Sequence, residues 1–563
     1  MENLRITMKM KEMTPNIKPI SYLSKVFVPS SGRKVKGQCE MEFAILFPLS
    51  LFPKFCKKSI VFTLLFLITQ LTAGQKATAK NAFGSLPSSA IASQKSTADR
   101  KAQSQPAICP AQLGGAIDAV IGDPQFLRSR WGILIQPLSS NDTIYARDRS
   151  QYFIPASSVK LLTTAAALHK LGSQFRIRTS VYGTSTGSNT TSLRVVGRGD
   201  PSLTDTQLTE LAQQLKRQGF KQVQQLVVDD GYFTGPTLNP SWEWEDVQAY
   251  YGAPVNSLIL NENAAVLTLL PQAQGRPLQI KWADTIAANG WRVENDTVTS
   301  APGSAASIEI GGVLGKPVLR IKGQLPTGSN PNIQAVAVLD PVESFLQHLR
   351  VALRSQQINI TQARVVSSGQ IGNEREVAAI ESPPLATLVM NTNQPSNNLF
   401  AESLLRTLGT MQNVSAVKNQ TSAEMGLAAL KQTLTELGVD PQSYNLVDGS
   451  GLSRHNLVSP DAIVQTLQAM AKSPEADAYR ASLPVAGVSG TLKNRFRDTP
   501  AQGIVQAKTG TVTGVAALSG YLNAPGFQPL VFSIIVNQSD QSAVTTRQAI
   551  DKIVLLLTRL RRC

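Results

Sequence analysis

A serine and a lysine stand three residues apart in the stretch Ser157-Ser158-Val159-Lys160. On a helix this spacing places both side chains on one face, one turn apart, so the amine reaches the hydroxyl. A lysine amine that is kept neutral can act as the general base for such a serine. The same spacing recurs at Ser31 and Ser415, but only Ser157 opens a strongly apolar helical pattern, which ends at Gly172. We therefore expect Ser157 to be a nucleophile and Lys160 to be its base.

Two further motifs, Ser-x-Asn and Lys-Thr-Gly, follow the Ser-x-x-Lys motif along the chain. Ser396-Asn397-Asn398 falls in a predicted turn before an apolar helix, and Lys508-Thr509-Gly510 falls on a predicted strand. Ser-x-Asn triplets occur elsewhere in the chain, whereas the Lys-Thr-Gly triplet occurs once. A helix with SxxK, a loop with SxN and a strand with KTG, in this order, form the three-motif signature of β-lactamases and penicillin-binding proteins.

The chain resembles one group within that superfamily, the class C low-molecular-mass penicillin-binding proteins of the S13 family. The roughly 240 residues between Ser157 and Ser396 match the long insertion of this group, and the stretch 448–456 (DGSGLSRHN) is similar to a characteristic family stretch. The resemblance covers about residues 110–560. It implies an α/β fold, a transpeptidase-like domain with an antiparallel sheet flanked by helices and a large inserted α/β region. It also implies a serine-type D-alanyl-D-alanine carboxypeptidase or endopeptidase that acts on peptidoglycan peptides, binds β-lactams and needs no cofactor or metal.

The resemblance also assigns roles to the motif residues. Ser157 would attack the carbonyl of the penultimate D-alanine, and Lys160 would take its proton while burial and the charge of Lys508 keep its amine neutral. Ser396 would relay a proton to the leaving nitrogen, and Asn398 would hold Lys160 and a substrate amide. The substrate carboxylate would bind Lys508, Thr509 and Gly510, and the backbone N–H groups of Ser157 and Thr511 would form the oxyanion hole.

Three residues outside the motifs match substrate-contact positions of the family. Asp246 would bind a diaminopimelate side chain, and Tyr251 and Arg454 occupy other substrate-contact positions of the family. In a crosslink to diaminopimelate the leaving amine has a carboxylate on a D centre, as a leaving D-alanine does, so one site could trim stem peptides and open crosslinks. Asp246 as a cap or surface carboxylate, and Arg454 as a brace for the loop backbone, stay open alternatives. Thr513 replaces a substrate-binding Gln of a relative, which leaves fine specificity open.

Composition shifts suggest the domain order. We expect a catalytic domain built from residues 107–175 and 356–563 around an inserted region, 176–355, whose inner part at 262–325 forms a third domain. A basic extension (1–58) precedes an apolar run (59–75), and residues 76–106 are a Ser/Ala/Gln-rich linker. The apolar run, with lysines before it and small residues after it, predicts a signal peptide; a retained anchor is the alternative, and it is the sole candidate for membrane contact.

Cleavage of a signal peptide would decide which cysteines remain in the mature protein. Signal cleavage would leave Cys109 and Cys563, which form a disulfide candidate in an oxidising compartment such as the periplasm; two free thiols are the alternative.

The net charge is +16, of which the first 58 residues carry seven units. No Lys/Arg stripe with interleaved aromatic residues indicates nucleic-acid binding. Without a GxSxG elbow or metal-ligand spacing, the rivals are a β-lactamase or esterase on the same fold, and a non-catalytic wall-binding or β-lactam-sensing protein.

Overall fold

The computed structural model describes residues 106–184, 192–369, 374–411 and 420–563, all within one compact unit of the chain, Asp99–Cys563. The basic extension at 1–58, the apolar run at 59–75 and nearly all of the predicted linker lie outside these residues, as does Ser415. Among the helices that are described, none combines the length and the apolar character required to span a membrane.

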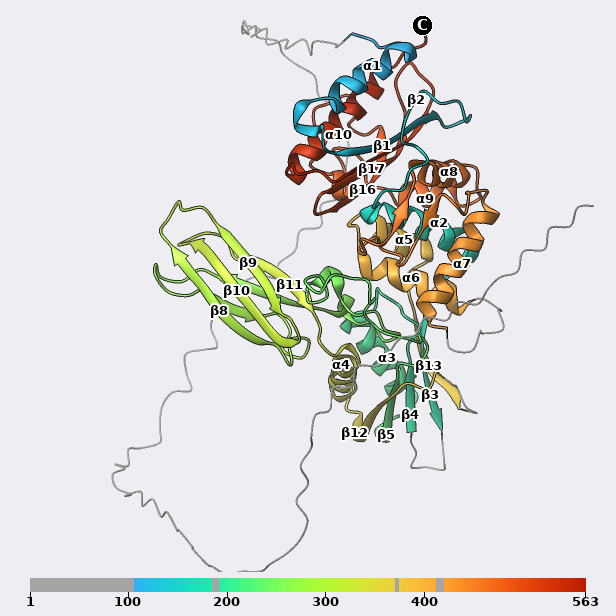
Figure 1. Ribbon diagram of the computed structural model, residues 1–563. Coiled ribbons are helices and arrows are strands. Elements are labelled where there is room, and N and C mark those ends of the chain that lie inside the picture. Colours follow the sequence, from blue (N-terminus) through green and yellow to red (C-terminus); the bar gives the residue numbers. More distant parts are fainter. Residues whose placement is uncertain (1–105, 185–191, 370–373, 412–419) are drawn as a thin grey trace, which may run out of the picture. The chain divides into compact units, whose positions relative to one another are not determined.

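An antiparallel five-stranded sheet carries the KTG motif (Figure 1). In sheet order its strands are β16 (Val505–Val512), β17 (Val515–Leu522), β18 (Leu530–Asn537), β1 (Arg130–Pro137) and β2 (Tyr145–Arg147). Every residue of β17 and β18 is buried, because helices cover both faces of the sheet. Successive side chains of β1 enter different cores, Leu134 on one face and Ile133 and Ile135 on the other. The predicted antiparallel sheet flanked by helices is confirmed.

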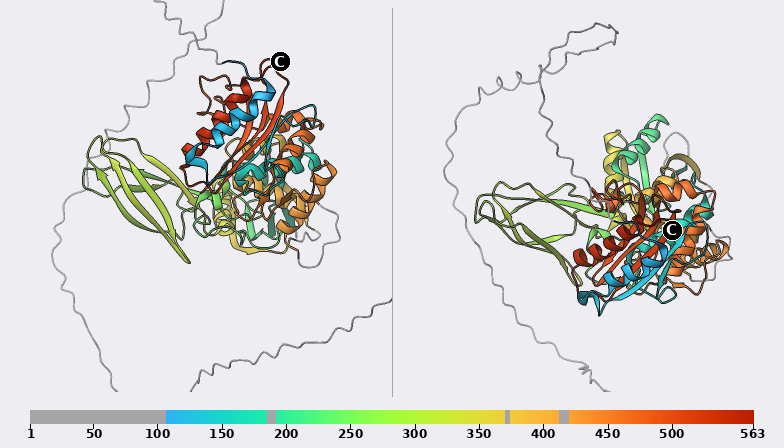
Figure 2. Two further views of the ribbon diagram at one scale, coloured as in Figure 1. Left: turned by 45° about the horizontal axis from the view of Figure 1, so that its top comes forward. Right: turned by 90° about the horizontal axis from the view of Figure 1, so that it is seen from above.

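Two helices far apart in the sequence cover one face of this sheet. Helices α1 (Pro110–Ile121) and α10 (Ala543–Thr558) lie side by side against it in Figures 1 and 2. Apolar side chains of both helices join those of the strands in one core. A disulfide links Cys109, which immediately precedes α1, to Cys563 beyond α10, and thus ties together the two segments on this face.

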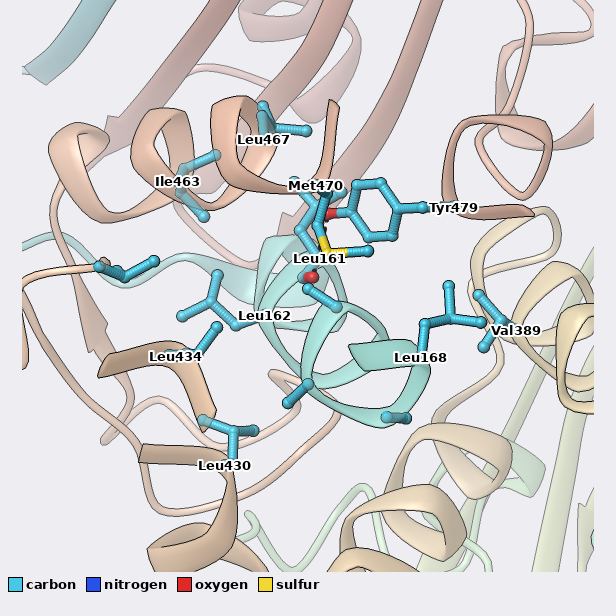
Figure 3. Close-up of a cluster of buried hydrophobic side chains, with 14 of the residues drawn as sticks. Leu161, Leu162, Leu168, Val389, Leu430, Leu434, Ile463, Leu467, Met470 and Tyr479 are labelled. Carbon is cyan, nitrogen blue, oxygen red and sulfur yellow. Dashed lines mark hydrogen bonds between the residues drawn. The ribbon is translucent and has the colours of Figure 1, made fainter. Parts of the chain in front are cut away.

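Helix α2 (Val159–Leu171) lies on the other face and is enclosed by further helices (Figure 3). Its first ten residues are all buried, as expected for a core helix rather than a surface helix. Tyr479 donates a hydrogen bond to the Leu161 carbonyl at 3.0 Å, which fixes α2 from the side. A short 3₁₀ turn, η2 (Ala156–Ser158), precedes α2 and carries Ser157 on this firm support. The surrounding helices are α5 (Leu385–Asn393), α6 (Asn398–Thr410), α7 (Ser422–Glu436), α8 (Pro460–Ala471) and α9 (Ala476–Ala481).

The chain between α2 and α5 contains a second five-stranded sheet, in the order β12-β5-β4-β3-β13. Neighbouring strands β4, β5 and β12 are parallel, and such strands require crossover connections. Two helices with one apolar face each, α3 and α4, lie in these connections and share a core with the sheet. The elements are β3 (Arg178–Thr184), β4 (Ser192–Val196), α3 (Asp205–Arg217), β5 (Gln222–Asp229), α4 (Pro341–Ser355), β12 (Asn359–Val366) and β13 (Arg375–Glu381).

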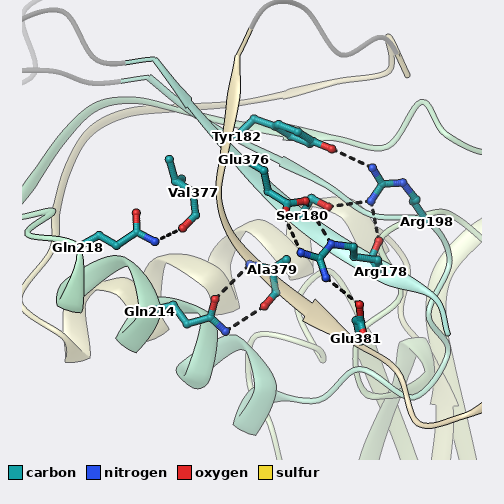
Figure 4. Close-up of polar contacts among 10 residues, drawn as sticks. All are labelled: Arg178, Ser180, Tyr182, Arg198, Gln214, Gln218, Glu376, Val377, Ala379 and Glu381. Atoms are coloured by element: carbon teal, nitrogen blue, oxygen red, sulfur yellow. Dashed lines mark hydrogen bonds and ion pairs between the residues drawn. The ribbon is translucent and has the colours of Figure 1, made fainter.

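Strand β13 brings the chain back from this sheet toward the SxN motif, and polar contacts fasten it (Figure 4). Arg178 of β3 pairs with Glu376 and Glu381 at 2.5 and 2.8 Å. From α3, Gln214 both donates to and accepts from the backbone of Ala379, at 2.9 and 3.1 Å. These contacts hold the start of α5, and with it the turn that carries Ser396, close to the inserted sheet.

Six strands lie between β5 and α4 and form two three-stranded sheets, β11-β6-β7 and β8-β10-β9, with one apolar core. They are β6 (Ala264–Leu270), β7 (Gln279–Trp282), β8 (Arg292–Ser300), β9 (Ser307–Val313), β10 (Lys316–Pro326) and β11 (Asn332–Ala337). The paired strands continue past residue 325, because β11 closes the first sheet against β6. The boundaries of the inserted domains stay a prediction.

Candidate active site

Ser157 lies half-buried in the η2 turn, at the N-terminal end of α2. The preceding Ala156 has a positive φ of 47°, which is costly for a residue with a side chain. Two glycines press on this turn from other segments. A Cβ atom on Gly451 would lie 1.9 Å from the Ala156 carbonyl oxygen, and one on Gly510 would lie 2.7 Å from the Pro155 carbonyl oxygen. The η2 turn, called the nucleophile turn below after the role expected for Ser157, therefore has the shape that backbone contact with these two glycines permits.

Lys160 is completely buried one turn into α2. Its Nζ donates to Ser157 Oγ at 3.0 Å, to Asn398 Oδ1 at 2.6 Å and to the Ser450 carbonyl at 2.6 Å. Burial lowers the pKa of Lys160 to about 7, against the opposing charges of Asp448 and Glu402. A buried amine within hydrogen-bond distance of a serine hydroxyl, and half neutral near pH 7, has both the geometry and the proton affinity of a general base.

Lys508 and Ser396 form a second pair. Lys508 is completely buried on β16 and donates to Ser396 Oγ and to the Thr509 carbonyl, both at 2.8 Å. Ser396 lies in the turn between α5 and α6 with a positive φ of 67°. Burial, and then the charge of Lys160, hold the pKa of Lys508 well below its usual range. The two amines lie close enough for the charge of one to act on the other, and the expectation that Lys508 helps to keep Lys160 neutral stays a prediction.

Asn398 begins α6 and links two parts of the site. Its Oδ1 accepts from Lys160, as expected, while its Nδ2 donates to the Tyr251 carbonyl at 2.8 Å. The amide group that the sequence assigns to a substrate amide is therefore engaged by the inserted region. This contact joins the residue that binds Lys160 to a short turn, η3 (Tyr250–Gly252), which lies nearly 150 residues earlier in the chain.

The KTG strand lies at one edge of the catalytic sheet. Up to Ala507 its outer edge pairs with residues 484–486. Beyond that point Gly510 packs on the nucleophile turn, and Thr509 donates to Thr491 Oγ1 at 2.8 Å. Thr511 is exposed at the end of the strand. The strand thus passes alongside Ser157, at the place where the sequence predicts binding of the substrate carboxylate and an oxyanion hole.

Asp246, Tyr251 and Arg454 lie at the border of the site. Tyr251 donates to Asp246 Oδ1 at 3.1 Å; burial and the neighbouring carboxylate raise the Tyr251 pKa to about 12. Burial also raises the pKa of Asp246. Arg454 donates to the Thr513 carbonyl at 3.0 Å and lies 3.7 Å from a carboxylate oxygen of Glu243. Arg454 therefore braces the loop backbone, and its role toward substrate stays a prediction.

Two buried carboxylates near Lys160 have no role in the sequence-based prediction. Asp448 accepts hydrogen bonds from the backbone N–H of Gly451 and Ser453, both at 2.7 Å, and further ones from two side chains. Those side chains belong to Asn456 and Trp242, at 2.8 and 3.0 Å. Glu402 lies on α6, four residues after Asn398, and this helical spacing is the sequence signal that could have pointed to it.

One cluster of metal-ligand type occurs among the described residues, away from the three motifs. It contains His348, Asp205 and Asp284. The two ring nitrogens of His348 lie 2.8 Å from an oxygen of Asp205 and 3.0 Å from one of Asp284. Because both nitrogens already face carboxylates, these contacts join α3, α4 and the segment after β7. The chemistry of the serine site uses none of these groups.

Comparisons with known proteins agree with this geometry. A family model described as the D-Ala-D-Ala carboxypeptidase 3 (S13) family matches residues 113–560. A D-alanyl-D-alanine carboxypeptidase of Actinomadura sp. (strain R39) is 33% identical over 452 residues, which are 76% of this chain and 81% of the relative. Penicillin-sensitive carboxypeptidase A of Dictyostelium discoideum is 30% identical over 77% of this chain and 87% of its own. Penicillin binding protein 4 of Haemophilus influenzae has the same fold, with a TM-score of 0.67 at 24% identity over 78% of this chain and 97% of that one.

Proposed function

The chain belongs to the D-Ala-D-Ala carboxypeptidase 3 (S13) family, and we propose that Ser157 is the nucleophile with which it cleaves D-alanyl peptide bonds of peptidoglycan. The chain is a serine peptidase of the penicillin-binding kind, so both peptide substrates and β-lactams acylate one serine. The observation that carries this assignment is the 3.0 Å contact between Ser157 Oγ and the buried, half-neutral amine of Lys160.

Acylation begins with removal of the Ser157 proton by Lys160. Asn398 Oδ1 and the Ser450 carbonyl accept from the same amine, so its lone pair is directed by the groups that also stabilise the ammonium once it forms. Ser157 Oγ then bonds to the substrate carbonyl carbon, and backbone N–H groups of Ser157 and Thr511 stabilise the oxyanion. When the oxyanion collapses, the C–N bond breaks and the leaving nitrogen takes a proton through Ser396, which leaves the acyl-enzyme. Hydrolysis of the acyl-enzyme by water regenerates the serine.

Lys508 and Ser396 serve the other side of the scissile bond. A carboxylate that binds beside Lys508 raises its proton affinity, so substrate binding and protonation of this amine are coupled. Ser396 Oγ accepts from Lys508, which leaves its own proton available for the leaving nitrogen. Thr509 and Gly510 complete the carboxylate pocket along β16. Penicillin, which also has a carboxylate near its reactive carbonyl, takes the same place.

The border formed by Asp246 and Tyr251 extends the proposal to crosslinked substrates. A carboxylate with a neighbouring phenol suits the ammonium and amide groups of a diaminopimelate side chain, and the Tyr251 carbonyl connects this border to Asn398. In a crosslink the leaving amine bears a carboxylate on a D centre, as a leaving D-alanine does. One site would therefore release terminal D-alanine and open crosslinks.

The action of the enzyme on peptidoglycan places it outside the cytoplasm. A disulfide between Cys109 and Cys563 supports this, because disulfides persist in oxidising compartments. We assign export to the apolar run at 59–75, as a cleaved signal peptide. Mass spectrometry of the N-terminus of the mature protein separates cleavage from retention as an anchor.

The direct test is mass spectrometry of muropeptides incubated with the mature protein, with and without penicillin. Penicillin-sensitive loss of one alanine, or splitting of crosslinked dimers, is expected, with no activity in Ser157→Ala. Ser158→Ala is the matched control: it removes the adjacent, buried hydroxyl, for which the described structure holds no hydrogen-bond partner. Stable penicillin labelling at Ser157 without any peptide turnover would instead identify a sensor, and rapid release of the penicilloyl group would identify a β-lactamase.

A further inference from the structure

Glu402 is a buried acid that the proposed reaction does not use. It lies on α6, one turn beyond Asn398, and is 2% exposed. Its Oε1 accepts from the backbone N–H groups of Gly449 at 2.9 Å and Ser450 at 2.8 Å. Burying a carboxylate away from water costs free energy unless hydrogen bonds compensate it, so a neutral side chain would hold this loop at a lower cost.

The loop that Glu402 fastens ends directly on the general base. The Ser450 carbonyl accepts from Lys160 Nζ at 2.6 Å. The N–H of that same peptide unit belongs to Gly451 and donates to Asp448 at 2.7 Å. Glu402 thus holds the preceding peptide unit, through the Ser450 N–H, and Asp448 holds the peptide unit of the carbonyl itself. The carbonyl that orients Lys160 is therefore clamped by two buried acids.

A small set of charged groups surrounds Glu402. Asp448 from the 448–456 loop, Lys160 from α2 and Arg406 from its own helix act on it or with it. Arg406 also interacts with Asp230 and donates to the Pro236 carbonyl. Of the helices that pack on α6, α5 has no ionisable side chain. The ionisable side chains of α7 are exposed; they are Glu424, Lys431 and Glu436.

We propose that Glu402 is a positioning residue of the reaction: it fixes the peptide whose carbonyl orients Lys160, and its carboxylate charge acts on that amine. This inference rests on the proposed function of Lys160 as the base. An ionised Glu402 favours the ammonium form of Lys160, and burial raises the pKa of Glu402 itself, with a further contribution from the charge of Asp448. The charge that opposes the neutral base is thus itself weakened near neutral pH.

Two substitutions separate the charge from the contact. Glu402→Gln removes the charge and keeps an Oε1 that can accept from both N–H groups. Glu402→Asp keeps the charge and withdraws the acceptor by one methylene. Glu309→Gln, at an exposed position on β9, is the matched control. The rate of acylation by penicillin is measured between about pH 5 and 9, roughly the range on both sides of the Lys160 pKa. Release of D-alanine and thermal unfolding are measured alongside.

For Glu402→Gln the part of the acidic limb nearest neutral pH, where wild-type Glu402 is ionised, is expected to move to lower pH by up to about one unit, since a nearby negative charge no longer favours the ammonium. At lower pH the two profiles should converge, because wild-type Glu402 is itself protonated there. For Glu402→Asp the limb is expected to stay in place while the plateau falls about tenfold or more, because the clamped carbonyl shifts. A Glu402→Gln profile that superimposes on the wild-type profile overturns the proposal, and so does a Glu402→Asp plateau at the wild-type rate. If the wild-type protein is acylated by penicillin but releases no D-alanine, the proposed peptidase function is refuted. The acylation profiles of the Glu402 variants still test the positioning role in that case. Absence of wild-type acylation refutes both.

Discussion

Replacing Gly451 by alanine tests whether the nucleophile turn is shaped by backbone contact. Gly451 lies in the 448–456 loop with a φ of 80°, and its Cα faces the carbonyl of Ala156, the residue before Ser157. Real Cβ atoms essentially never lie within 3.0 Å of another heavy atom, whereas an added Cβ here would lie 1.9 Å from the Ala156 oxygen. The two segments must therefore separate by about 1 Å, and a displacement of about 1 Å at reacting groups costs on the order of 10²-fold in rate.

Gly438 provides the matched control for this substitution. It has a φ of 83°, nearly the same as Gly451, but nothing lies within 4 Å of the position where its Cβ would be. Alanine at either site carries the same backbone cost, about 1 kcal/mol. Both variants should lose similar stability from backbone strain, and Gly451→Ala should lose more from the clash. Only Gly451→Ala should slow acylation.

Stopped-flow measurement of penicillin acylation, with thermal unfolding alongside, distinguishes the two effects. We expect Gly451→Ala to acylate about 10²-fold more slowly at saturating penicillin, and Gly438→Ala to acylate at the wild-type rate. Wild-type acylation by Gly451→Ala would refute the reasoning, because the turn would then tolerate a shift that the geometry forbids. Equal slowing by both variants would refute it too, since general strain would be the cause.

Three other outcomes follow from the site. Since Lys160 is a base only when deprotonated and its pKa is lowered to about 7, kcat/KM for peptide substrate should rise about tenfold per pH unit below that value and level off above it; a profile that stays low until pH 10 would contradict this. Asn398→Ala removes the 2.6 Å acceptor of Lys160 and should slow penicillin acylation by about 10²-fold with little change in penicillin affinity, as stopped-flow rates at several concentrations would reveal. Replacing Cys109 and Cys563 by serine should lower the free energy of unfolding by about 2–5 kcal/mol in denaturant titrations while leaving acylation at 25 °C unchanged; a rate loss would mean that the disulfide shapes the site.

The parts of the site that depend on local spacing could be predicted from the sequence. Residues 157 and 160 are one helical turn apart in any helix, so their contact needs no knowledge of the rest of the fold. The KTG triplet on a strand and the apolar pattern after Ser157 follow from periodicity in the same way. Burial of α2 was also predictable in kind, because its apolar residues occur on every side of the helix.

Contacts made through backbone atoms left no such signal. The Ser450 carbonyl and the Tyr251 carbonyl each bind a side chain of the SxxK or SxN motif, yet any residue type offers the same carbonyl. The side-chain identities at these positions therefore do not report the contact. Gly451 is the exception, since its φ of 80° and the close approach of Ala156 both favour glycine. Even there the sequence indicates a special backbone position and does not identify what lies against it.

The direction of electrostatic effects was equally hidden, because it depends on which charges are buried together. The resemblance implied that burial and the charge of Lys508 would together keep Lys160 neutral. In the structure two acids, Asp448 and Glu402, also lie near Lys160 and favour its charged form, so burial must outweigh them. Burial and the charge of Lys160 hold the pKa of Lys508 well below its usual range. A substrate carboxylate beside Lys508 would raise that pKa again, so we expect substrate binding and protonation of Lys508 to be coupled.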